Sequence, residues 1–424
     1  MAGTGARVGR SATIPAVMKT LSRSSSTRRA FLARSAAFTI TAAPLVRHAA
    51  AFSKAPKEAR RILVGTGKGT TGQYGPSGSI LIYNWDASTG TLTPDGVAAA
   101  LPDSTWLEPS PDGKYLYVAS ELSEFQGQPT GAVSSFKIQD AKHGGKLELL
   151  SQVNSASVGT CQCGVDHTGH VVVSADYGGG SVASFASNSG HLTPATWSEH
   201  FDGYPAGTAP VPSRQEAAHA HFASFSPDNK YAFVNDLGWD RIHTYKLNVV
   251  DAQLVPTGQC NLHPGAGPRT LHFHPNGKIA YCMNEIDSTV DVMKYDPAWG
   301  SLTQIQQINL LSANSPKLTS TGCDTVLTRD GKFAYFANRG NNFLFSCHVD
   351  PATGRLTPFD GDPRTTTGGK TPRNFRLDPT ERWILVANQD SDQLSAIARD
   401  PGTGKLANEA KSVACPRPMC IRFV

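Results

Sequence analysis

The hydrophobic and polar positions of this chain repeat a short unit, in which a polar turn precedes a strand-length hydrophobic run. Six copies read SPDGKYLYVAS, DHTGHVVVSAD, SPDNKYAFVND, HPNGKIAYCMN, TRDGKFAYFAN and DPTERWILVAN. The turn residues are Asp112, Thr168, Asp228, Asn276, Asp330 and Thr380. Their intervals of 56, 60, 48, 54 and 50 residues are typical of four-stranded blades with variable loops, because helical repeats have shorter periods. The pattern therefore predicts a propeller.

The seventh copy of the unit is divided between the two ends of the sequence. Residues 61–66 (RILVGT) form a hydrophobic strand with no partner strand before them. Residues 417–424 (RPMCIRFV) have the form of the strand that precedes each turn. We therefore expect these segments to pair and complete one blade, which closes the ring and leaves no fully open sheet edge.

A second series of motifs gives the same number of units. Each unit ends in a hairpin of the type Gly-x-Leu-Thr, and the copies read TGTLTP, GGKLEL, SGHLTP, the weaker DAQLVP, WGSLTQ, TGRLTP and TGKLAN. Glycine supplies the positive φ that such reversals need. Helical periodicity is almost absent after residue 60. We predict an all-β fold, a seven-bladed β-propeller over residues 59–424, with one blade closed by the N- and C-terminal strands.

The first 51 residues have a different character, with eight Lys or Arg and no Asp or Glu. Residues 26–32 (STRRAFL) match the twin-arginine export pattern. A weakly apolar stretch follows at 35–46, too short to span a bilayer, and then a run of alanines at 49–51 suited to cleavage. We interpret residues 1–51 as a twin-arginine (Tat) signal peptide read by the export machinery, which predicts a periplasmic or secreted protein. The alternative is a disordered basic tail.

Removing this segment reverses the sign of the charge. The rest of the chain has 31 basic and 34 acidic residues, a net charge of −3, which argues against a nucleic-acid partner. The eight cysteines have no metal or redox spacing. Export to an oxidising space would allow disulfides, and Cys415 with Cys420 could close a small loop. Buried thiols are the interpretation that we favour.

Candidate site residues lie where the innermost strands and adjacent loops of a propeller meet the central channel. His219 and His221 alternate along one predicted strand, so period two places both imidazoles on one face. Arg269 follows a proline that fixes the start of its strand, His272 lies on the same strand, and Glu285 ends the outgoing strand.

Three further polar residues, Asp324, Arg339 and Arg373, occupy equivalent positions in later units. Equivalent positions in a ring point toward one axis, so these residues can converge although they are distant in sequence. Arginine matches a carboxylate or a developing oxyanion, and histidine can transfer a proton near neutral pH. The set suits an anionic substrate with a carbonyl group, although each arginine or histidine alone is equally consistent with a structural role.

Histidines on two neighbouring units also raise the alternative of a zinc site, formed by His219, His221, His272 and His274. Their spacing is not compact, and no carboxylate is obviously interleaved between them. We therefore expect no metal and no other cofactor.

Four segments carry a resemblance to a known family. They read HAHFASFSPDNKYAFVNDLGWDRIHTYKL, GAGPRTLHFHPNGKIAYCMNEIDSTVDV, FANRGNN and TPRNFRLDPTERWILVANQDSDQ. They resemble the seven-bladed propeller lactonases, which include bacterial 6-phosphogluconolactonases and fungal 3-carboxy-cis,cis-muconate lactonizing enzymes. The resemblance covers nearly the whole chain after the signal. The site proposed for the fungal branch implies the catalytic residues His221, Arg269, Glu285 and Arg339. We assign substrate contact to His219, His272, Asp324 and Arg373.

The chain departs from the family pattern at three places. Cys161-Gln162 replaces a common Cys-His, Cys323-Asp324 replaces a common Ala-Glu, and Asp176-Tyr177 replaces a common Asn-Tyr before three glycines. These departures, together with export, argue against a phosphorylated sugar.

Our working hypothesis is hydrolysis of a sugar-type lactone, with His221 as general base, Glu285 orienting water or shuttling the proton, and Arg269 with Arg339 stabilising the oxyanion. The alternatives are a muconate-type cycloisomerase and a non-catalytic binding propeller.

Overall fold

The computed structural model describes residues 61–68, 78–139, 146–312 and 319–424. All of these belong to one compact unit, His48–Val424. The predicted export signal at residues 1–51 lies outside the described residues. Among the described residues, no helix combines the length and the apolar character needed to cross a bilayer.

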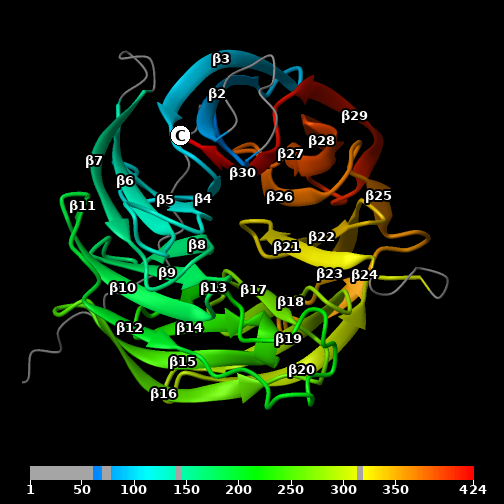
Figure 1. Cartoon of the computed structure of the whole chain (residues 1–424). Coiled ribbons are helices and arrows are strands. Elements are labelled where there is room, and N and C mark those ends of the chain that lie inside the picture. The colour runs from blue at the N-terminus through cyan, green and yellow to red at the C-terminus, as the bar shows by residue number, and fades with distance from the viewer. Residues whose placement is uncertain (1–60, 69–77, 140–145, 313–318) are drawn as a thin grey trace, which may run out of the picture. The chain divides into compact units, whose positions relative to one another are not determined.

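The described strands form seven antiparallel sheets, which we number as blades along the chain (Figure 1). The first blade contains β1 (Arg61–Thr66), β2 (Ser79–Asp86), β3 (Thr91–Ala100) and β30 (Pro418–Phe423). The second contains β4 (Ser104–Pro109), β5 (Tyr115–Ser120), β6 (Ala132–Ile138) and β7 (Leu147–Asn154). The third contains β8 (Thr160–Val165), β9 (Val171–Asp176), β10 (Ser181–Asn188), β11 (His191–Leu192) and β12 (Trp197–His200). The fourth contains β13 (Ala220–Phe225), β14 (Tyr231–Asp236), β15 (Arg241–Asn248) and β16 (Gln253–Asn261).

The remaining three blades follow the same plan. The fifth contains β17 (Pro268–Phe273), β18 (Ile279–Asn284), β19 (Thr289–Asp296) and β20 (Ser301–Asn309). The sixth contains β21 (Thr321–Leu327), β22 (Phe333–Arg339), β23 (Phe343–Val349), β24 (Leu356–Pro358) and β25 (Arg364–Thr366). The seventh contains β26 (Pro372–Leu377), β27 (Trp383–Asn388), β28 (Gln393–Arg399) and β29 (Leu406–Ala414). Short 3₁₀ turns, η2 (Leu237–Trp239) and η3 (Gln389–Ser391), follow β14 and β27.

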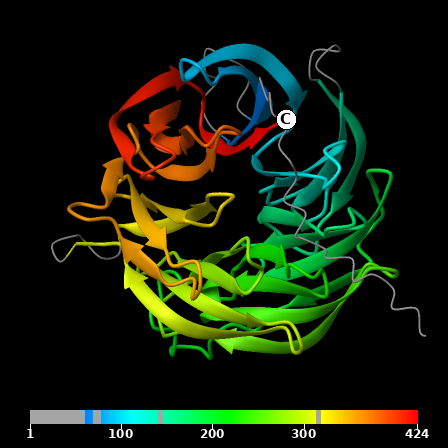
Figure 2. The ribbon, with the colours of Figure 1, turned by 180° about the vertical axis from the view of Figure 1, so that it is seen from behind.

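The blades close into a ring through the first blade. Strand β30 pairs antiparallel with β1, and Val64 lies opposite Ile421, so the predicted pairing of the two ends is confirmed. The innermost strands β30, β4, β8, β13, β17, β21 and β26 each contact the next, and β26 contacts β30 again. Figures 1 and 2 show these strands around a central axis from both sides. The prediction of a seven-bladed propeller is confirmed.

The hydrophobic core lies between neighbouring blades. One cluster joins the first and seventh blades through Ile62, Leu81, Leu385 and Ile421, and similar clusters join the other neighbours. The two neighbours of each blade therefore cover both faces of its sheet, which explains why the second strand of each blade is a continuous apolar run rather than an alternating one.

The two repeated motifs of the sequence interlock in the structure. The hairpin glycine Gly300 has a φ of 67°, and a Cβ there would lie closer than 3.0 Å to the ring of Tyr231 in the preceding blade. Gly404 meets Phe333 in the same way. Tyr231 and Phe333 each lie three residues after a repeated turn residue. The glycines thus permit both a tight reversal and close packing between blades.

All eight cysteines are free thiols, and all except Cys260 are buried. The proposed small loop between Cys415 and Cys420 is therefore not present, and the interpretation as buried thiols holds. Burial raises the pKa of Cys415 to about 12, which keeps this thiol protonated and unreactive at neutral pH.

Candidate functional site

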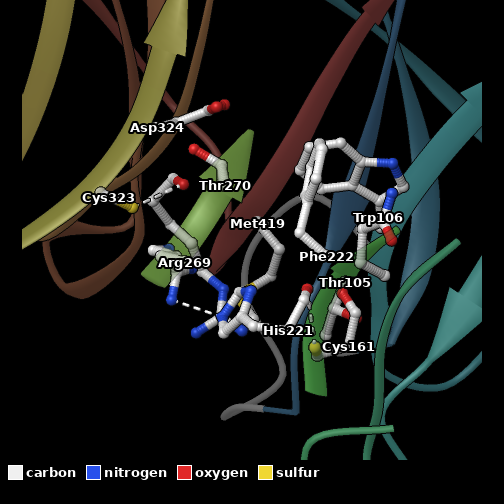
Figure 3. A pocket seen from close by; sticks show the side chains of 12 residues that line it. Thr105, Trp106, Cys161, His221, Phe222, Arg269, Thr270, Cys323, Asp324 and Met419 are labelled. Atoms are coloured by element: carbon white, nitrogen blue, oxygen red, sulfur yellow. Dashed lines mark hydrogen bonds between the residues drawn. The ribbon is translucent and has the colours of Figure 1, made fainter. Parts of the chain in front are cut away.

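Each innermost strand contains a one-residue irregularity near its start. Register shifts interrupt the pairing at the first-to-second strand contact of every blade. The residues that these bulges displace from the ladder are Thr105, Cys161, His221, Arg269, Cys323 with Asp324, Arg373 and Met419, which we call the bulge ring. A β-bulge re-aims a side chain that plain alternation would bury within the sheet. All members of the bulge ring line one pocket at the centre of the propeller (Figure 3).

The chain repeat sets the position of this ring. Arg269 lies seven residues before its turn residue, Asn276, and His221 lies seven before Asp228. The same interval holds for Thr105, Cys161, Cys323 and Arg373 in the second, third, sixth and seventh blades. Because each blade copies the same hairpin, the same sequence position reaches the channel in each.

A buried carboxylate, Glu285, holds three arginines beside the ring. It follows β18 directly and is only 3% exposed. Its Oε1 accepts from Arg214, and its Oε2 accepts from Arg269 and from Arg339, the latter at 2.7 Å. Burial alone would raise the pKa of Glu285, but the guanidiniums of Arg339, Arg269 and Arg214 hold it well below its ordinary value of 4.5. Glu285 is therefore ionised at neutral pH.

His221 completes this cluster. Arg269 Nη1 contacts both His221 Nε2 and Glu285 Oε2. Burial lowers the pKa of His221 well below its ordinary 6.5, and the guanidinium of Arg269 lowers it further. The imidazole is therefore neutral at neutral pH. Because Nε2 accepts a hydrogen bond from Arg269, the single N–H proton of the neutral His221 ring lies on Nδ1. This Nδ1 has no hydrogen-bond partner among the described residues.

The four residues predicted to be catalytic are thus joined by direct contacts, although they span more than one hundred positions of the sequence. Figure 3 shows His221 and Arg269 side by side, with Met419 next to them. Arg373 also faces the pocket and pairs with Glu121 at 3.0 Å. With His221 neutral, the four arginines and two glutamates of this cluster carry a net charge of +2. Two of the arginines, Arg269 and Arg373, line the pocket itself, where they suit an anionic group or a developing oxyanion.

His219 does not line the pocket, unlike His221. Its ring stacks on Tyr177 with centroids 4.3 Å apart, and its Nδ1 lies 2.8 Å from the Tyr177 carbonyl oxygen. His221 meets the edge of the same tyrosine ring. Both imidazoles therefore share one side, as predicted, but His219 precedes β13 and His221 lies at the bulge, so simple period-two alternation is not the cause.

His272 and Asp324 form a second polar cluster. His272 Nε2 lies 3.1 Å from Asp324 Oδ1, and Asp324 Oδ2 accepts from Arg376 and Asn374, each at 2.7 Å. Burial by itself would raise the pKa of Asp324. The guanidinium of Arg376 helps to hold this pKa well below its ordinary value instead. In Figure 3 Asp324 lies apart from the pair of His221 and Arg269.

The four histidines of the zinc alternative do not converge. His274 Nε2 lies 2.9 Å from the carbonyl oxygen of Gly331, and His272 contacts Asp324. Within the part of the chain that the structure describes, no group of three potential metal ligands is present. The arrangement gives no support to the zinc alternative.

Several residues of this site were not predicted from the sequence. Thr105, Cys161 and Met419 belong to the bulge ring, and the interval of seven residues before each turn would have identified the first two. Arg214 lies in a loop outside the repeat, and nothing in its local sequence marks it. Its contacts with Glu285 and Tyr177 in the folded chain reveal it.

Comparison with known proteins gives a consistent result. A family model described as "Lactonase, 7-bladed beta-propeller" matches residues 61–423. The 6-phosphogluconolactonase of Bacillus subtilis (strain 168) is 32% identical over 360 residues, which make up 84% of this chain and 98% of that protein. The periplasmic gluconolactonase of Pseudomonas aeruginosa superposes with a TM-score of 0.77 at 31% identity, covering 86% of this chain and 98% of that chain. A putative 6-phosphogluconolactonase from Bacteroides fragilis NCTC 9343 gives a TM-score of 0.74 at 31% identity, covering 86% and 97%.

Proposed function

This chain belongs to the seven-bladed β-propeller lactonase family, and from that premise we propose that it opens a sugar-type lactone by hydrolysis at the bulge ring. The observation that carries the proposal is the direct contact of Arg269 with both a neutral buried imidazole and a buried carboxylate. A guanidinium supplies oxyanion stabilisation and a neutral imidazole supplies a proton acceptor, the two elements that ester hydrolysis needs.

In the proposed mechanism, the lactone carbonyl oxygen draws the guanidinium of Arg269 away from His221. This frees Nε2, which carries the lone pair of the neutral imidazole. A water molecule attacks the carbonyl carbon and gives a proton to Nε2, while Arg269, which lines the pocket, stabilises the oxyanion and Arg339 supports it through the shared Glu285 Oε2. The ring C–O bond then breaks, and the leaving alkoxide takes the proton from His221. One water is consumed and a hydroxy acid is released.

Glu285 has a positioning role in this mechanism. Of the two roles expected from sequence, a proton shuttle is disfavoured because a carboxylate with a pKa well below 4.5 is a poor proton acceptor. Its contacts with three guanidiniums instead support a role in orienting the arginines.

The proposed substrate is an unphosphorylated sugar lactone in an exported compartment. Three arguments support this: the twin-arginine pattern at residues 26–32, the family departures at Cys161-Gln162 and Cys323-Asp324, and the periplasmic description of the Pseudomonas aeruginosa gluconolactonase. Cell fractionation tests the location. Comparing kcat/KM for gluconolactone and its 6-phosphate tests the substrate, and a clear preference for the phosphate would contradict this part of the proposal.

Replacing His221 or Arg269 by Ala tests the chemistry. Loss of the general base or of the oxyanion donor should each lower kcat by about 10²–10⁴, measured by acid release in a pH-indicator assay with spontaneous hydrolysis subtracted. The exposed His191 and Arg329 provide matched controls, and their Ala variants should keep full activity. Full activity in a folded His221→Ala or Arg269→Ala variant would refute the proposal.

A further inference from the structure

The connection between β12 and β13, residues 201–219, is much longer than its ring position requires. The equivalent connections between the last strand of one blade and the first strand of the next need only residues 101–103, 262–267 or 415–417. Three residues are therefore enough to make this crossing. Long connections in compact domains usually carry function, and this one brings Arg214 to Glu285.

Hydrogen bonds attach this loop to Leu237 and Asp240. Asp240 also holds the segment that leads into β17, the strand that carries Arg269. Tyr204 donates to Asp240 Oδ2 at 2.7 Å, and Gln215 donates to the carbonyl oxygen of Leu237 at 3.1 Å. The carboxylate of Asp240 also accepts from the backbone of Gly265 and Gly267, each at 2.7 Å. Gly267 lies two residues before Arg269. The loop and the segment that precedes Arg269 are therefore both held by the buried Asp240.

Arg214 contacts a different carboxylate oxygen of Glu285 from the one that the other two arginines contact. It takes Oε1, whereas Arg269 and Arg339 share Oε2. Without Arg214, Oε1 would be a buried acceptor with no donor, which is costly. A planar guanidinium readily binds both oxygens of one carboxylate. Arg269 would then rotate onto both oxygens of Glu285 and leave His221 Nε2.

We propose that Arg214 is a positioning residue, which occupies Glu285 Oε1 so that Arg269 is held beside His221 through Oε2 alone and can turn to the lactone carbonyl. The inference rests on the proposed lactone hydrolysis, and it adds a residue outside the repeated blades to the site. Arg214 does not line the pocket, so it acts through Glu285 rather than on substrate.

Kinetics of Arg214→Ala, Arg214→Lys and the control Arg329→Ala test this inference. Displacement of a reacting group by about 1 Å costs on the order of 10²-fold in rate, so we expect Arg214→Ala to lower kcat by about 10–100-fold with KM nearly unchanged. Lysine can occupy Oε1 as a point charge, so Arg214→Lys should restore most of kcat. Arg329 pairs with Glu381 on the surface, and Arg329→Ala should match the wild type.

A double-mutant cycle provides a second measurement. If Arg214 acts only through Glu285, its removal should have little further effect on kcat in a Glu285→Gln background. Circular dichroism and thermal melting of each variant establish that it is folded.

Three outcomes would overturn the inference: unchanged kcat in Arg214→Ala, a rise in KM at constant kcat, or additive losses in the cycle. Each of these leaves the proposed function intact if His221→Ala is inactive. Full activity of His221→Ala would instead refute the proposed function itself.

Discussion

Replacing Glu285 by Gln removes the negative charge held among three guanidiniums while keeping the size of the side chain. Removing one partner of a buried ion pair typically costs about 3–5 kcal/mol of stability. The Glu285 side chain is 4% exposed, but those of Arg214 and Arg339 are 31% and 15% exposed. Water can therefore screen part of the unpaired charge, so we expect the lower end of this range, about 3 kcal/mol.

Urea denaturation at pH 7 measures this loss, as a lower midpoint with an unchanged m value. The pKa of Glu285 is lower in the folded than in the unfolded protein. Its contribution is therefore complete above pH 4.5 and is lost as the pH falls through the folded-state pKa. The difference between wild type and Glu285→Gln should shrink in acid.

The matched control is Asp362→Asn, which removes a carboxylate that is 70% exposed from a surface pair with Arg364. Such pairs contribute about 0–1 kcal/mol. Equal midpoints for Glu285→Gln and Asp362→Asn at pH 7 would refute the reasoning, because burial of the cluster would then have no energetic consequence.

Two further predictions concern pH and packing. Because the pKa of His221 lies well below 6.5 and its neutral form is the base, kcat/KM should stay flat through pH 6.5 and fall only in more acidic buffers; an acid limb centred at 6.5 would contradict the assignment. Gly65→Ala should destabilise the ring by about 1–3 kcal/mol, because its Cβ would lie closer than 3.0 Å to the backbone oxygen of Ser104 in the second blade. Gly258→Ala, where nothing lies within 4 Å, should melt close to the wild type, and equal melting temperatures would show that the blades can separate without cost.

The sequence contained most of the architecture because a propeller is built from local hairpins. Each blade repeats the same turn, strand and glycine, so the number of blades can be counted from the amino-acid sequence alone. The split copy, residues 61–66 and 417–424, predicted closure because an unpaired strand needs a partner. The spacing of seven residues before each turn also contains the bulge ring, although polarity alone directed attention to only some of its members.

The tertiary structure decided what the repeat cannot encode. Bulges, rather than strand alternation, turn His221 and Arg269 toward the axis. Burial among arginines keeps Glu285 ionised. Arg214 reaches the site from a loop that has no counterpart in the repeat. Such contacts depend on where distant segments meet after closure, and pKa values depend on burial, so neither could be predicted from local sequence.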